Sequence, residues 1–128
     1  MFKVLHFIRR KPHLTHEQFR DHFERSHAAM ALRFCGHLFT AYQRNYFTTV
    51  YTGGDARQAG SGYGPRAGDW DLISEWILPD EAAYDEIRKI ITGDVIRQFH
   101  ELEEKFLDRP AQVMLRCSVA DTGTRPAS

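Results

Sequence analysis

The sequence predicts an α+β fold whose elements follow one another in the order β-α-β-β-α-β. Four short segments are rich in the β-branched and aromatic residues that favour strands. Two longer segments each begin with a helix-start signal. The length of 128 residues fits a single domain, which we place at residues 1–119.

The first strand and the first helix are predicted near the N-terminus. Residues 2–9 form the strand, and Lys11-Pro12 ends it because proline donates no ladder hydrogen bond. Thr15 and Gln18 have the spacing of a capping box, which marks the start of a helix. This helix is expected to reach about Phe34.

The middle of the chain predicts two strands around a long loop. Residues 37–51 are rich in aromatic and β-branched residues and predict the second strand. Residues 52–69 contain six of the nine glycines and predict a flexible loop insertion. Residues 70–78 predict the third strand, and both of its alternating faces are partly apolar. That pattern is typical of a sheet that is covered on both faces.

The C-terminal half predicts a second helical region and a last strand. Pro79-Asp80-Glu81 is a helix-start signal with acidic residues in the first turn, and the helix is expected over residues 80–91. Gly93 interrupts it, and a second helical piece runs to about Phe106. Residues 111–119 predict the fourth strand, and the small, polar residues 120–128 predict a disordered tail.

This order of elements is that of the ferredoxin-like, split-βαβ arrangement, with a four-stranded antiparallel sheet and helices on one face. Such an arrangement leaves the second face of the sheet bare. The third strand is nevertheless apolar on both of its faces. We therefore expect a homodimer in which two sheets pack face to face.

The composition excludes several classes of partner. Seventeen basic and seventeen acidic residues cancel, and no basic block stands out, so we expect neither nucleic acid nor an anionic membrane as partner. No apolar run is long enough to span a bilayer, and the N-terminus lacks the order of a signal peptide. Cys35 and Cys117 form no disulfide framework, which favours a cytoplasmic location. His16 and His22 are six residues apart on opposite sides of a helix, so we expect no metal and no cofactor.

His27 is the leading candidate for acid/base chemistry. It lies one helical turn from Phe23 and from Met30, so it faces the sheet with the apolar residues. Imidazole titrates near neutral pH, and a histidine that faces a pocket can act as general acid or base. The structural alternative is a partly buried histidine that is hydrogen-bonded to a backbone carbonyl or to Glu75.

Further candidates lie on the first two strands. His6 shares a strand face with Val4 and would approach the same cavity as the helix histidine if that face meets the helices. Tyr42 and Tyr46 share one face of the second strand, and a phenol can donate to a developing oxyanion. Asn45, on the other face, could orient a carbonyl. The structural alternatives are a capped strand histidine and amphipathic interface tyrosines.

The third strand contributes aromatic and acidic candidates. Trp70 and Trp76 share a face and could form the wall of an aromatic-binding pocket, although packing is the more frequent use of tryptophan. Asp71 and Glu75 share the other face. Their separation suits a dimer-interface salt bridge as well as acid/base chemistry.

Four stretches, taken in order, resemble a known family. They are IRRKPHLTHEQFRDHFERSHAAMA (8–31), AYQRNYF (41–47), WDLISEW (70–76) and EEKFLD (103–108). All four are similar to motifs of EthD-type proteins in the dimeric α+β barrel superfamily. The resemblance covers about residues 3–115 and implies this fold, a homodimer and a histidine over the pocket at the position of His27. The chain departs from the family pattern in reading HAAM, where a proline often follows His-Ala, and in its longer 52–69 loop.

The resemblance also implies a range of activities, since the superfamily includes dehydratases, decarboxylases, cyclases, cofactor-free monooxygenases and haem-binding proteins. We expect a cofactor-independent enzyme of the lyase type (dehydration, decarboxylation, cyclisation or retro-aldol cleavage) that acts on an aromatic or polyketide-like substrate. The residues assigned to catalysis are His27, Tyr42 and Tyr46, and those assigned to substrate binding are His6, Phe23, Asn45, Trp70 and Trp76. The alternatives are a cofactor-free monooxygenase on a phenolic substrate, or a non-catalytic haem- or small-molecule-binding or accessory protein of a catabolic oxygenase system.

Overall fold

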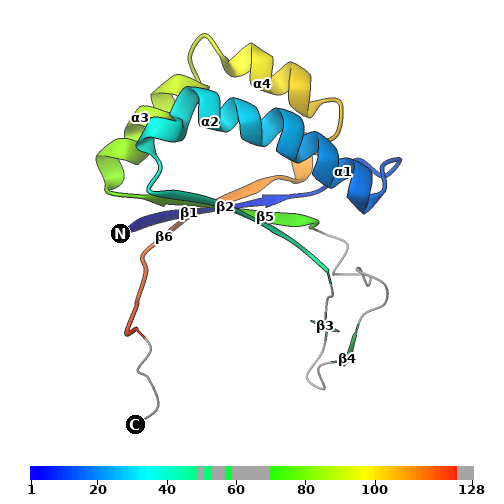
Figure 1. The fold of residues 1–128 in the computed structure, drawn as a ribbon, viewed down its shortest axis with the longest axis horizontal. Coiled ribbons are helices and arrows are strands. Elements are labelled where there is room, and N and C mark those ends of the chain that lie inside the picture. The colour runs from blue at the N-terminus through cyan, green and yellow to red at the C-terminus, as the bar shows by residue number, and fades with distance from the viewer. Residues whose placement is uncertain (49–50, 53–56, 59–69, 124–128) are drawn as a thin grey trace.

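Four strands form one antiparallel sheet in the order β2-β5-β1-β6 in the computed structural model of the chain (Figure 1). The central strands are β1 (Phe2–Ile8) and β5 (Leu72–Leu78), and the edge strands are β2 (Ala41–Tyr46) and β6 (Val113–Cys117). The structure describes residues 1–48, 51–52, 57–58 and 70–123. The prediction of an α+β, ferredoxin-like fold is confirmed.

The two faces of the central strands differ in burial. In β1, Val4, His6 and Ile8 are buried, and the residues between them are half-buried. Val4 lies opposite Trp76 of β5 in the register, and His6 lies opposite Ser74. Because side chains alternate along a strand, these residues all lie on the face that the helices cover.

The first helical layer is continuous from residue 16 to residue 35 but changes its winding. It consists of α1 (His16–His22), a π-helical segment η1 (Phe23–Ala28) and α2 (Ala29–Cys35). The predicted capping box is present: Gln18 N–H donates to Thr15 Oγ1 at 3.1 Å, and Thr15 N–H donates to Gln18 Oε1 at 2.9 Å. The wide turn of a π-helix is frequent at functional sites, and this one carries His27.

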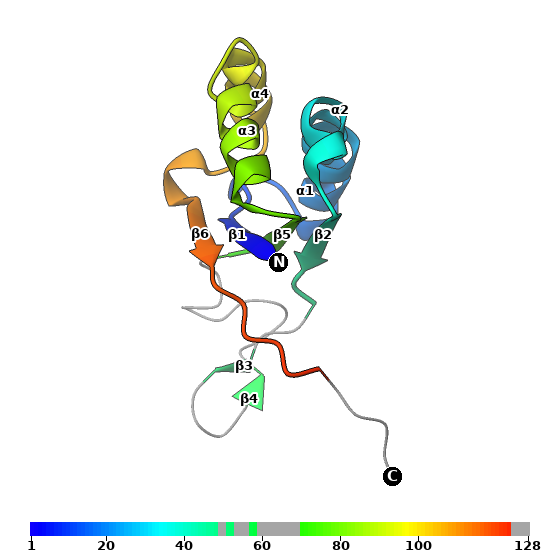
Figure 2. The ribbon, with the colours of Figure 1, turned by 90° about the vertical axis from the view of Figure 1, so that its left-hand side faces the viewer.

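The second helical layer consists of α3 (Glu81–Ile91) and α4 (Ile96–Glu103). Asp80 caps α3 by accepting a hydrogen bond from Ala83 N–H at 2.9 Å. Gly93 lies between the two helices, as the sequence predicts. A short 3₁₀ turn, η4 (Arg109–Ala111), then leads into β6. Both helical layers lie on the same face of the sheet (Figures 1 and 2).

Several predicted bounds need correction or fall outside the description. The second strand is shorter than the predicted 37–51, because Gly36–Leu38 forms a 3₁₀ turn (η2) that prolongs the first helix. Within the predicted 52–69 loop, β3 (Tyr51–Thr52) pairs with β4 (Arg57–Gln58), and the rest of that loop lies outside the described residues. Of the predicted tail, 120–123 have no regular structure and 124–128 also lie outside the described residues.

The core between the sheet and the helices divides into two clusters of buried side chains. One is built around the aromatic rings of Phe19, Phe23 and Phe106. The other is built around Val4, Trp76, Cys35 and Ile87 and their buried neighbours. The first cluster is tightly filled by rings, with Phe23 and Phe106 in an edge-to-face contact at 6.2 Å.

Candidate functional site

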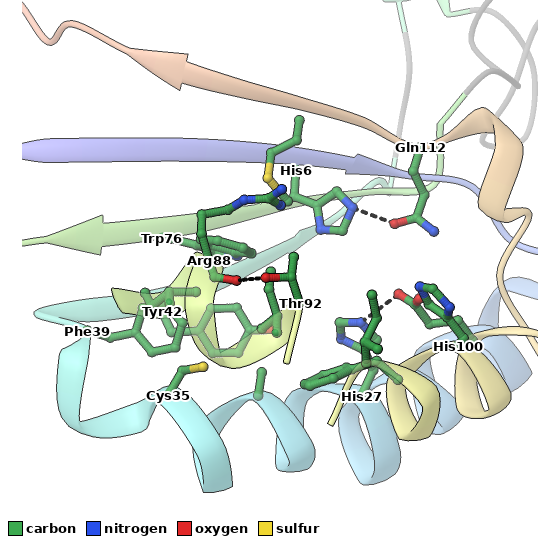
Figure 3. Close-up of a pocket in the computed structure, with 17 residues that line it drawn as sticks. His6, His27, Cys35, Phe39, Tyr42, Trp76, Arg88, Thr92, His100 and Gln112 are labelled. Atoms are coloured by element: carbon green, nitrogen blue, oxygen red, sulfur yellow. Dashed lines mark hydrogen bonds and ion pairs between the residues drawn. The ribbon is translucent and has the colours of Figure 1, made fainter. Parts of the chain in front are cut away.

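A cavity of about 190 Å³ lies between the sheet and the two helical layers (Figure 3). Every element of both layers except α1 contributes to it, as do all four strands or the residues next to them. Its walls are mostly apolar. The lining residues are His6, His27, Ala31, Cys35, Phe39, Tyr42, Trp76, Ile87, Arg88, Ile91, Thr92, Ile96, Phe99, His100, Glu103, Gln112 and Met114.

His27 enters this cavity from η1 and pairs with Glu103 of α4. Its Nε2 lies 3.1 Å from Oε2 of Glu103, and both side chains are about one-tenth exposed. With Nε2–H donating to the carboxylate, Nδ1 carries the free lone pair. That atom is buried and has no hydrogen-bond partner among the described residues. Because buried polar atoms are nearly always paired, this nitrogen is an acceptor that a molecule in the cavity could use.

Two further contacts hold the pair in place. The ring of Phe23 stacks on that of His27, with centroids 4.6 Å apart and an angle of 21° between the planes. The other oxygen of Glu103, Oε1, lies 3.5 Å from Nε of Arg109. The carboxylate therefore lies between an imidazole and a guanidinium, both of which stabilise its negative charge.

His6 occupies the sheet side of the cavity in a different environment. Its Nε2 lies 2.6 Å from Oε1 of Gln112, so the ring donates there and Nδ1 remains an acceptor. Burial lowers the pKa of His6 to about 4, and the proximity of His27 adds to the effect. The hydrogen bond to Gln112 and the charge of Glu103 oppose this shift without cancelling it. His6 is therefore neutral at physiological pH.

One short segment supports both histidines. Arg109 contacts the carboxylate that binds His27, and Gln112 binds His6. Arg109 begins the η4 turn and Gln112 directly follows it, and Pro110 restricts the backbone between them. The connection between α4 and β6 thus holds both histidines, with Gln112 in the wall of the cavity and Arg109 behind Glu103.

The two tyrosines assigned to catalysis lie in different places. Tyr42 lines the cavity and stacks on Phe39 at 5.0 Å, and burial raises its pKa to about 12, so its hydroxyl remains a donor. Tyr46 does not line the cavity. Its hydroxyl donates to Oε2 of Glu24 at 2.6 Å, and Arg44 binds the same carboxylate. Burial and the neighbouring Glu24 raise the pKa of Tyr46.

Two residues assigned to substrate binding lie on the other face of the sheet. The amide of Asn45 donates to Ile73 O at 2.9 Å and to Glu75 Oε1 at 3.1 Å. Trp70 lies before β5 and packs edge-on against Phe7, with ring centroids 5.5 Å apart. Phe7 points away from the helices, so the prediction that Trp70 shares a face with Trp76 is wrong.

The other residues considered for the site lie in the cavity wall, in the core and on the far face of the sheet. Trp76 lines the cavity, with its ring edge-on to that of His6 at 6.3 Å. Phe23 is fully buried and supports the ring of His27 from the core side. Glu75 pairs with Lys3 at 3.3 Å, so it is not the partner of His27.

Asp71 is buried and makes its contacts within the chain. It is 5% exposed and accepts a hydrogen bond from Arg10 N–H at 2.8 Å. His16 Nδ1 lies 3.1 Å from its Oδ1. The expectation of a dimer-interface salt bridge therefore does not fit Asp71.

The sequence reasoning missed Glu103, Gln112 and Arg88 as pocket residues. Glu103 lies within the EEKFLD stretch and could have been found there, since a buried acid near a helix end needs a partner. Gln112 and Arg88 carry no local signal of their position. Among the described residues, no group of three histidine, cysteine or acidic side chains could hold a metal ion.

The comparisons with known proteins bear on the family and the fold. A family model of the EthD domain matches residues 11–110. The chain belongs to the EthD domain family. The solved structure of At3g17210 from Arabidopsis thaliana is similar to this EthD-domain chain with a TM-score of 0.61 and 10% identity, covering 97% of this chain and 100% of that one. This likeness shows the fold alone. No curated protein matches the sequence at a significant level.

In the described part of this EthD-domain chain, no helix has the length and apolar character needed to cross a bilayer.

Proposed function

We propose that this EthD-domain protein is a cofactor-independent enzyme that moves protons on a small, largely apolar molecule. The observation that carries the proposal is that two histidines with different hydrogen-bond partners line one mostly apolar cavity. His27 is paired with the carboxylate of Glu103, and His6 is held neutral beside Gln112. Titratable groups in contrasting environments are the usual mark of acid and base partners.

The geometry gives each group a role. Glu103 holds the tautomer of His27 in which Nδ1 has a free lone pair, as an orienting acid does for a general base. Tyr42, which stays protonated, can donate to an oxygen on which negative charge develops. The groups lie at the buried end of a mostly apolar cavity, where low polarity strengthens these interactions.

This machinery suits reactions that move a proton next to a carbonyl or phenol. On an aromatic or polyketide-like substrate, dehydration and cyclisation remove a proton from carbon and retro-aldol cleavage removes one from a hydroxyl, whereas decarboxylation delivers a proton to the carbanion that remains when CO₂ leaves. The aromatic walls formed by Phe39, Tyr42, Trp76 and Phe99 support an unsaturated ligand. No contact among the described residues favours oxygenase chemistry or haem binding over this proposal.

The test follows proton exchange and needs no knowledge of the natural product. Aryl 1,3-diketones and aryl methyl ketones are incubated in D₂O with the protein, and loss of the α-proton signal is followed by NMR. We expect exchange above the buffer rate, lost in His27→Ala and kept in the exposed control His13→Ala. Circular dichroism establishes that both variants fold. A folded His27→Ala protein with unchanged exchange, or a wild type that never exceeds the buffer rate, would overturn the proposal.

We further propose that the protein is a homodimer through the sheet face opposite the helices. Leu5 and Phe7 lie on this face, opposite Leu115 and Val113 of β6. Leu115 is 43% exposed and Val113 is 38% exposed, although both lie in the sheet. A second copy would remove this apolar surface from water. Both cysteines are free, which supports the proposal of a reducing, cytoplasmic location.

A further inference from the structure

The cavity has a buried floor and an exposed mouth. His6, His27 and Glu103 at the floor are each less than one-tenth exposed. Arg88, on the last turn of α3, and Thr92, which directly follows that helix, also line the cavity but are exposed. A ligand that enters therefore passes a guanidinium before it reaches the histidines.

Arg88 has no carboxylate partner among the described residues. Its neighbour Lys89, also exposed, lies 3.9 Å from Glu86. The one carboxylate that lines the cavity belongs to Glu103, which His27 and Arg109 already contact. Figure 3 shows the Arg88 side chain extending from α3 toward the sheet. The cavity therefore offers a cation whose charge no protein group within it balances.

The size of the cavity limits what can fill it. Its volume is about 190 Å³. An engineered apolar cavity of about 150 Å³ binds benzene, and pockets for larger ligands begin near 300 Å³. One substituted ring fits here, whereas a fused polycycle does not. The ring would lie against Phe39, Tyr42 and Trp76, which line the same space.

We infer that the ligand is a small single-ring carboxylate, whose ring fills the apolar cavity and whose carboxylate binds Arg88 at the mouth. Guanidinium and carboxylate pair through two parallel hydrogen bonds, and this geometry favours arginine over lysine. The inference rests on the proposed function for the reacting end of the molecule at His27. It narrows the aromatic or polyketide-like class to one ring with one anionic group.

The experiment compares a carboxylate with its neutral amide. 2-Hydroxybenzoate and 2-hydroxybenzamide are titrated into the wild-type protein, and the indole signals of Trp76 and Trp70 are followed by NMR. We expect the carboxylate to bind about tenfold more tightly or better, as a charge-assisted hydrogen bond allows. The Trp76 signal should move and the Trp70 signal, from outside the cavity, should not.

Variants of Arg88 and Lys89 test whether Arg88 causes the preference for the carboxylate over the amide. Arg88→Gln should remove the preference for the carboxylate, Arg88→Lys should keep part of it, and Lys89→Gln should leave it unchanged. Lys89→Gln removes the same charge from the same turn and so controls for general electrostatic attraction. Equal binding of acid and amide, no binding of the acid, or equal losses in Arg88→Gln and Lys89→Gln would each overturn the inference.

The two proposals can fail separately. His27→Ala should keep the carboxylate preference while it loses proton exchange. If exchange occurs without any carboxylate preference, the ligand class is wrong and the proposed function stands. If the preference depends on Arg88 but no exchange occurs, the ligand class stands and the proposed function is wrong.

Discussion

His27 of the first helical layer and Glu103 of the second are joined by a buried contact of 3.1 Å between Nε2 and Oε2. The two residues are 76 positions apart in the chain. The contact connects the π-helical segment to the end of α4, directly beside the cavity. It is therefore both a candidate catalytic pair and a link between the layers.

Glu103→Ala should destabilise the protein. It removes the hydrogen-bond partner of His27 and the carboxylate beside Arg109 in a buried site, and leaving a buried donor without its partner costs about 1–3 kcal/mol. Urea denaturation measures the change in the free energy of unfolding. The control is Glu104→Ala, whose side chain is 61% exposed and should change stability by less than about 0.5 kcal/mol. Similar small losses in both variants would contradict a structural role for the pair.

The sequence predicts this site only in part, and the limit is physical. The capping box and the helical period place His27 on the sheet side, and the strand period places His6 on the helix side, because both patterns are local. The partner of His27 depends on how two layers pack, which no local period encodes. Glu75, the alternative partner considered for His27, lies on the opposite face of the sheet from the cavity and pairs with Lys3.

Strand ends were the other source of error. Trp70 and Trp76 would share a face if the third strand began at residue 70, but β5 begins at Leu72. Trp70 lies before the strand, so the alternation of side chains along β5 does not fix its direction, and its ring packs on Phe7. The aromatic residues after Gly36 likewise predicted a strand where the chain makes a 3₁₀ turn. Strand propensity is a property of single residues, and it does not show where the preceding helix ends.

His6 should make stability depend on pH. Its pKa is about 4 in the folded protein and about 6.5 in the unfolded chain. Between these values the unfolded chain binds a proton that the folded protein does not, so stability is full above about pH 6.5 and falls toward pH 4. The shift corresponds to about 3 kcal/mol. His27, Glu103 and Gln112 are the charged and polar groups that face His6 and act on its pKa.

The measurement is the free energy of unfolding at a series of pH values across this window. His6→Gln should flatten the dependence relative to wild type, because the variant has no imidazole to protonate. His13→Gln, at an exposed position, should leave the dependence as it is. A wild-type curve that runs parallel to that of His6→Gln would rule out the buried neutral state.

Cys35 should resist thiol reagents although it lines the cavity. It is 1% exposed, and burial raises the pKa of its thiol to about 11, so little thiolate exists near neutral pH. Cys117 on β6 is half-buried and should react first with iodoacetamide. Mass spectrometry of peptides from the native protein gives the order, and protein unfolded in urea should show both sites labelled alike. Preferential labelling of Cys35 in the native protein would contradict this burial.

Replacing Tyr42 should affect proton exchange, whereas replacing Tyr46 should affect the free energy of unfolding. Tyr42→Phe removes a donor from the cavity and should slow the proton exchange described above at little cost in stability. Tyr46→Phe leaves Glu24 without one charge-assisted hydrogen bond, which should cost about 1 kcal/mol while exchange is kept. Exchange rates and urea denaturation are measured on both variants. Loss of exchange in Tyr46→Phe at unchanged stability would restore Tyr46 to the catalytic set.

Leu115→Asp should convert the proposed dimer to a monomer. The side chain is 43% exposed on the sheet face away from the helices and lies opposite Leu5, and a carboxylate buried there between two copies would lose its hydration. Light scattering coupled to size exclusion gives the mass at micromolar concentration. Leu32→Asp, at a position of 46% exposure on α2, is the matched control and should remain dimeric. The face-to-face arrangement is excluded if the wild type is itself monomeric, or if both variants dissociate alike, because the apolar sheet face would then have no special part in assembly.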